Sequence, residues 1–196
     1  MESLRCFDRI SIEDPTLFEN GIATRYLLWS GPHIVSTPLL FRYERPILDP
    51  HDPLMRNLAR LIVTMPVINY GLFADAITLH FPLEAVDVRM VEAMLENTAR
   101  EIYLNKILGE NPFLLPEYRP PAFVKPDRFC RAVLQVDGVE RLSWKGALDP
   151  TGYAVSSSGG KESLLSYGML DEIGLEPHCC FFNESGRHWY TALNAH

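Results

Sequence analysis

Residues 153–163 read Tyr-Ala-Val-Ser-Ser-Ser-Gly-Gly-Lys-Glu-Ser, and this stretch decides the fold of the last third of the chain. Tyr153 to Val155 suit a short buried strand. Apolar residues between Leu164 and Ile173 share one face of a helix that stops at Gly174. A strand, a glycine turn and a helix bring backbone N–H groups together around an anion at the helix N-terminus. The stretch therefore predicts a phosphate-binding loop.

The side chains of the loop suit the same ligand. Gly159 and Gly160 let the backbone approach a phosphate with no side chain in the way. Ser158 and Ser163 add hydroxyl donors, and Lys161 adds a mobile positive charge. The alternative is a glycine turn that merely begins a helix, whose first turn favours an acidic side chain.

Two common phosphate loops are excluded by the spacing. A Walker A loop needs an initial glycine and a Ser or Thr after the lysine, but Val155 and Glu162 occupy those positions. A Gly-x-Gly-x-x-Gly dinucleotide loop is excluded because Gly159 and Gly160 are adjacent.

Residues 158–163 resemble the PP-loop of the N-type ATP pyrophosphatases, whose signature is Ser-Gly-Gly-x-Asp-Ser between a strand and a helix. Glu162 departs from this signature, since the family usually has Asp there. The resemblance implies that ATP and Mg²⁺ bind, that ATP is cleaved between the α- and β-phosphates, and that the loop holds pyrophosphate. The implied nucleotide-binding residues are Ser158, Gly159, Gly160, Lys161, Glu162 and Ser163, with Glu162 beside the Mg²⁺ ion.

A weaker resemblance is to the UDP-N-acetylmuramoyl-L-alanyl-L-glutamate epimerases. It is carried by Val-Ile-Asn-Tyr at 67–70, Glu-Ile-Tyr-Leu-Asn at 101–105 and Lys161. It implies that adenylation of a peptidoglycan precursor makes the glutamate α-proton more acidic, so that a base can remove it and the α-carbon can be inverted. No residue is identified as that base. The alternative is an ordinary helical layer with Tyr70 and Tyr103 in the core.

The rest of the chain reads as alternating strands and helices. Strands are expected at 22–29 and 33–43 with a turn between them, and at 76–81. Helical spacing begins near Leu54 and recurs over 83–108, with Gly109 as a left-handed C-terminal residue. The turn signal Asp137-Gly138 predicts a hairpin of 129–136 with 139–144.

Five prolines in residues 111–127 predict a linker. The expected organisation is α/β: an N-terminal α+β region over 1–127, then a PP-loop nucleotide domain with a parallel sheet over 128–196. The second strand of that domain is expected at 179–182, followed by a helix over 183–193, in which Asn183 or Glu184 faces the nucleotide or caps the helix. Two parallel strands are too few for a doubly wound domain, so a truncated fold is expected.

The four cysteines offer little chemistry. His178, Cys179, Cys180 and His188 suggest a metal site, but adjacent strand residues point to opposite faces and cannot easily share one ion. Cys6 and Cys130 have no partners at ligand spacing, so they read as buried packing residues.

Composition bounds the function. The net charge of −7 and the pI near 5.4 argue against DNA or an anionic membrane as partner. No secretory signal and no transmembrane run is recognisable, which favours a cytoplasmic protein. The expected partners are a nucleotide and a small-molecule substrate, with a homo-oligomer left open. The first expected function is ATP-dependent adenylation of a carboxylate; the alternatives are a non-catalytic nucleotide-binding or interaction module and a PP-loop enzyme of tRNA or deazapurine modification.

Overall fold

The computed structural model describes residues 4–109, 111–115, 125–141, 152–157 and 160–181. The chain is mixed α/β and divides into two units, residues 1–144 and 145–196. The elements are β1 (Phe7–Glu13), β2 (Thr16–Phe18), β3 (Gly21–Ser30), β4 (His33–Arg42), α1 (Pro53–Thr64), the 3₁₀ helix η2 (Met65–Tyr70), β5 (Ala74–His80), β6 (Leu83–Glu84), α2 (Ala85–Ile102), the π-helix η3 (Tyr103–Leu108), β7 (Val133–Val136), β8 (Val139–Glu140), β9 (Gly152–Ser156), α3 (Lys161–Glu172) and β10 (Glu176–Cys180).

The first unit is built on one mixed sheet with the order β4-β3-β1-β5-β7, in which β2 also pairs with β3. β1, β5 and β7 are parallel to one another, whereas β3 is antiparallel to β1, β2 and β4. The expected hairpin of β3 and β4 is confirmed. Its turn contains Gly31 at φ +56°, a backbone conformation that favours glycine.

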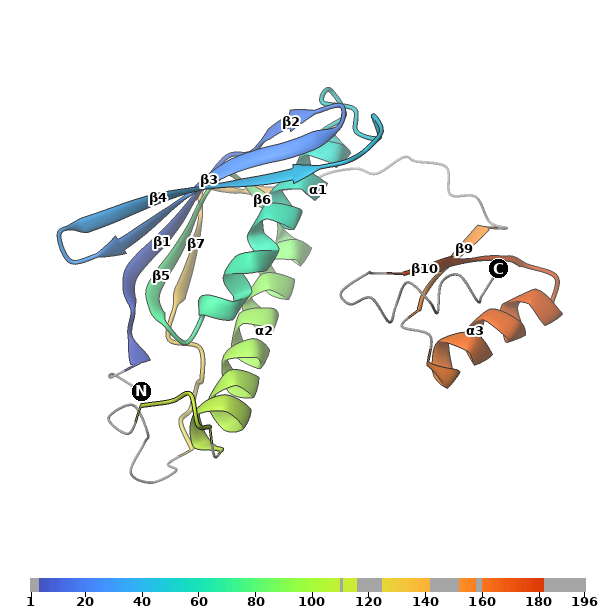
Figure 1. Ribbon diagram of the computed structural model, residues 1–196. Coiled ribbons are helices and arrows are strands. Elements are labelled where there is room, and N and C mark those ends of the chain that lie inside the picture. Colours follow the sequence, from blue (N-terminus) through green and yellow to red (C-terminus); the bar gives the residue numbers. More distant parts are fainter. Residues whose placement is uncertain (1–3, 110, 116–124, 142–151, 158–159, 182–196) are drawn as a thin grey trace. The chain divides into compact units, whose positions relative to one another are not determined.

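Helices α1 and α2 lie along the same face of this sheet (Figure 1). The register pairs Ile10 with Ile77 and Ile12 with Leu79, so four side chains point together from neighbouring strands into the core. All four are at most 1% exposed. Full burial of each such side chain stabilises the fold by about 1.5–3 kcal/mol.

Both helices follow the predicted spacing. Asp52 caps α1 by accepting from the Leu54 N–H at 2.9 Å, and a proline at the first helical position completes that start. In α2 the buried stripe is Val91, Leu95 and Ala99. Gly109 departs from expectation, because its φ of −66° and ψ of 162° are extended rather than left-handed.

The hairpin predicted around Asp137-Gly138 is wrong. β7 pairs with β5 and β8 pairs with β6, both in parallel, so the chain passes from one parallel partner to another instead of folding back. Because β7 belongs to the sheet of the first unit, the division falls at 144/145 rather than at the expected 127/128.

The second unit contains β9, α3 and β10. β9 and β10 form a parallel two-stranded sheet, in which Val155 pairs with Cys179. The expected strand, helix and second strand are therefore present in the expected order. Gly174, at φ +79°, turns the chain from α3 toward β10.

Candidate functional site

The candidate site is the loop that joins β9 to α3. The backbone N–H of Ser157 donates to the carbonyl of Cys180 at 2.9 Å, which fixes the start of the loop to the end of β10. The loop therefore leaves the sheet where two parallel strands end. In open α/β sheets this carboxyl edge is where ligands bind.

Gly160 begins the helix at the other end of the loop. It is the N-cap residue of α3, with φ −77° and ψ 163°, and its carbonyl accepts from the Leu164 N–H at 3.2 Å. Among the residues that the structure describes, no side chain caps this N-terminus. The first-turn N–H groups have no partner within a helix, so in the second unit they are donors for an anion or for water.

The first two side chains of α3 carry opposite charges at this N-terminus. Lys161 and Glu162 are both exposed. Within the described residues, neither side chain has a hydrogen bond or ion pair, which leaves the ammonium free to reach an anion at the loop. The carboxylate of Glu162 also interacts favourably with the positive end of the helix dipole.

Two serines from opposite sides of the loop contact each other. The Ser163 hydroxyl donates to the Gly160 carbonyl at 2.9 Å and lies 3.0 Å from Oγ of Ser157. Since a serine hydroxyl has a single proton, Ser157 is the donor in the second contact. Ser157 is only 7% exposed, so the pair holds the loop against the first turn of α3.

The structure thus places four of the six predicted loop residues on one turn: Gly160, Lys161, Glu162 and Ser163. Ser158 and Gly159 lie outside the described residues, as do Asn183 and Glu184. Glu162 belongs to no cluster of three or more His, Cys, Asp or Glu side chains within the part of the chain that the structure describes. It still fits Mg²⁺, because that ion is commonly held by one or two carboxylates together with substrate phosphates and water.

Helix α3 behaves unlike the helices of the first unit. None of its residues is buried, and its apolar side chains are exposed: Leu164, Leu165, Met169 and, just beyond it, Ile173 at 72%. The predicted single apolar face is wrong, because the apolar residues of α3 are spread around the helix, and the two-stranded sheet of this unit buries none of them.

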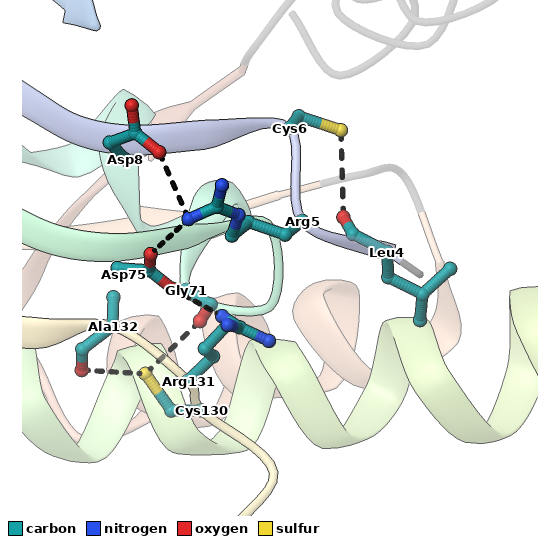
Figure 2. A network of polar contacts seen from close by, with 9 residues as sticks. All are labelled: Leu4, Arg5, Cys6, Asp8, Gly71, Asp75, Cys130, Arg131 and Ala132. Carbon is teal, nitrogen blue, oxygen red and sulfur yellow. Dashed lines mark hydrogen bonds and ion pairs between the residues drawn. The ribbon is translucent and has the colours of Figure 1, made fainter. Parts of the chain in front are cut away.

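The cysteines and the tyrosines separate into exposed and buried members. Cys179 is partly buried and Cys180 exposed, and His188 lies outside the described residues. Cys130 is buried as expected, but Cys6 is exposed. Burial raises the pKa of the Cys130 thiol, whose Sγ contacts the carbonyls of Gly71 and Ala132 (Figure 2). Of the two tyrosines expected in the core, Tyr103 is buried whereas Tyr70 is 42% exposed.

Sequence reasoning missed a second polar cluster, at the carboxyl ends of the parallel strands of the first unit. Arg60 of α1 donates through Nε and Nη2 to both carboxylate oxygens of Asp14, at 2.8 and 2.9 Å. These hydrogen bonds raise the pKa of Arg60 above its ordinary value, so the guanidinium stays positively charged. At the end of β5, His80 Nδ1 lies 3.2 Å from a carboxylate oxygen of Asp137. The available signal was that Glu13-Asp14, His80 and Asp137 each mark the end of a strand.

Comparison of the chain with protein-family models, with curated proteins and with solved structures finds no match in any of the three. Among the described residues, the structure contains no helix with the length and apolar character needed to cross a bilayer.

Proposed function

We propose that the chain binds ATP through the β9–α3 loop and activates a carboxylate by adenylation. The observation that carries the proposal is the N-terminus of α3: a glycine N-cap at the end of a parallel strand, with Lys161 exposed beside it. Backbone N–H groups, the helix dipole and a mobile ammonium at one point favour a polyphosphate.

In the proposed reaction the substrate supplies the nucleophile and the loop holds the leaving group. A carboxylate oxygen of the substrate attacks the α-phosphorus and forms a P–O bond, and the bond between the α-phosphorus and the oxygen that bridges to the β-phosphate breaks. The products are an acyl-adenylate and pyrophosphate. The first-turn N–H groups and Lys161 hold the pyrophosphate and stabilise the negative charge that develops on it.

Mg²⁺, when bound, neutralises phosphate charge and orients the leaving group. Glu162 is the described residue that would hold it. The side chain of Glu is one methylene longer than that of the family's Asp, so its carboxylate could reach farther from the helix backbone. An acyl-adenylate of glutamate would also carry a more acidic α-proton, which connects this chemistry with the epimerase resemblance.

A second candidate is a non-catalytic interaction module. The specific observation in its favour is α3, whose exposed leucines and methionine form an apolar surface in the same unit as the loop. In this case the turn at Gly160 only begins a helix, and no nucleotide binds.

Isothermal titration with ATP and MgCl₂ separates the two candidates. Adenylation predicts saturable binding of ATP and, with a suitable carboxylate present, release of pyrophosphate. A Lys161→Ala variant should bind ATP more weakly than the parent, and Lys106→Ala is its matched control, because Lys106 is an exposed lysine in the first unit. Absence of heat at millimolar nucleotide would leave only the interaction module.

A further inference from the structure

A cavity of about 390 Å³ opens in the first unit, away from the β9–α3 loop in the sequence. It is lined by His51, Pro53, Arg56, Arg60, Glu140 and Arg141. Its size lies within the range of small-molecule sites. Three of its six lining residues are arginines, although the chain as a whole has a net charge of −7. The cavity is therefore a local concentration of positive charge in an acidic protein.

Arg60 is the fixed part of the cavity. The residue is only 7% exposed, and the bidentate contact with Asp14 orients its guanidinium. Its Nη1 also donates to Glu140 at 3.4 Å. A guanidinium has five N–H donors, and three of them are used by these two carboxylates within the described residues. Two donors remain on a buried cation that lines the cavity.

Arg56 and Arg141 are the adjustable part. Both are exposed, and neither guanidinium has a hydrogen bond or ion pair among the described residues. One carboxylate, that of Glu140, lines the cavity with them. Arginine presents a planar pair of donors that matches the oxygens of a carboxylate or phosphate.

The cavity also lies where the topology of the sheet favours a ligand. Asp14, which anchors Arg60, directly follows the end of β1. Glu140 is the last residue of β8 and lies three residues after Asp137, which directly follows β7. β1 and β7 run parallel on either side of β5. The crevice beyond the carboxyl ends of parallel strands is the common binding position in such sheets.

We infer that this cavity is a binding site for a small anion carrying a phosphate or carboxylate group, with Arg56 and Arg141 as the contacting cations and Arg60 as the buried anchor. Among the described residues, none of the proposed nucleotide loop lines this cavity. Glu140 limits its affinity, because its carboxylate repels the ligand while it orients Arg60.

The test is titration of the full chain with inorganic phosphate and, separately, with glutarate, followed by calorimetry and by the arginine Nε–H signals in NMR spectra. Removing one charge-assisted contact weakens binding on the order of 10-fold, so an Arg56→Ala/Arg141→Ala double variant is expected to lose the saturable shift of the Arg60 Nε–H signal, which reports on this cavity and not on phosphate bound at the β9–α3 loop. Arg89→Ala, an exposed arginine of α2, is the matched control and should bind like the parent. The probe that binds more tightly identifies the anionic group.

Two further variants make the result specific. Glu140→Gln keeps the shape of the side chain and removes its charge, so binding should tighten several-fold. Lys161→Ala should leave anion binding in this cavity unchanged. A loss of ATP binding in that variant with no loss in the cavity would therefore show that the two proposals stand or fall separately. The inference is overturned if neither probe shifts the Arg60 Nε–H signal saturably at millimolar concentration, or if the double variant keeps that shift with the parent's affinity.

Discussion

Helices α2 and α3 both carry apolar residues, yet only α2 gathers them on one face and packs that face into a core. Val91, Leu95 and Ala99 of α2 are at most 1% exposed, whereas Leu164 and Leu165 of α3 are 51% and 65% exposed. The helices differ in the arrangement of their apolar residues and in the size of the sheet that each unit offers. α2 belongs to the unit with the six-stranded sheet, while α3 belongs to the unit in which two strands pair. Helical spacing predicts a helix, but burial depends on the surface that is available to cover it.

The largest expected effect comes from truncating one leucine in each unit. Leu79→Ala, at a site with 0% exposure, should lower the free energy of unfolding by about 2–5 kcal/mol, because it opens a cavity in the core. Leu165→Ala on α3 should change it by less than about 0.5 kcal/mol. Urea unfolding, followed by hydrogen exchange of β5 and β10 amides separately, measures both. Equal losses would mean that α3 is packed in solution.

A smaller effect is expected at the ion pair of Arg60. Asp14→Asn removes the charge that compensates a guanidinium whose side chain is only 9% exposed. The expected loss of stability is about 1.5–3 kcal/mol, the range for hydrogen bonds to charged groups. Asp171→Asn, at an exposed carboxylate of α3, is the control in the other unit and should have almost no effect. If Asp14→Asn left the free energy of unfolding unchanged, water would replace the carboxylate at no cost.

The smallest effect concerns the dependence of stability on pH. Hydrogen bonds from Arg131 and then from Arg5 lower the pKa of Asp75 (Figure 2). Because the folded state favours the ionised carboxylate, this stabilisation is fully present above the pKa of the unfolded chain, near 4. It is lost as the pH falls through the lower pKa of the folded state. Asp75→Asn should therefore flatten the loss of stability on acidification below about pH 4, as measured by thermal unfolding across pH. An unchanged slope in the variant would contradict the assignment.

Local signals in the sequence predicted local structure well. The turn at Ser30-Gly31-Pro32 produced the expected hairpin, and the spacing after Leu54 produced α1. Asp137-Gly138 carried an equally good turn signal, but there the strand that follows is two residues long and pairs with β6. A parallel partner distant in the sequence leaves no mark in the turn itself, so the tertiary pairing overrode the local preference.

The two candidate sites differ in the same way, because one depends on neighbouring residues and the other on residues far apart in the sequence. The glycines and Lys161 indicate the proposed nucleotide loop in the sequence, because that loop lies between one strand and one helix that are adjacent in the chain. The cavity around Arg60 could not be predicted, since it depends on a carboxylate 46 residues earlier in the chain and another 80 residues later. Buried charges of this kind become visible only when the topology brings their partners together.

The central claim is that the start of α3 holds a polyphosphate, and Lys161→Ala tests it most directly. The side chain is exposed and alanine is a good helix former, so the fold should be almost unchanged. A charge-assisted contact with phosphate contributes about 1.5–3 kcal/mol. Calorimetric titration with pyrophosphate or with ATP and MgCl₂ should therefore show binding roughly 10- to 150-fold weaker in the variant than in the parent and in Lys106→Ala. Equal affinity of Lys161→Ala and the parent would contradict the claim.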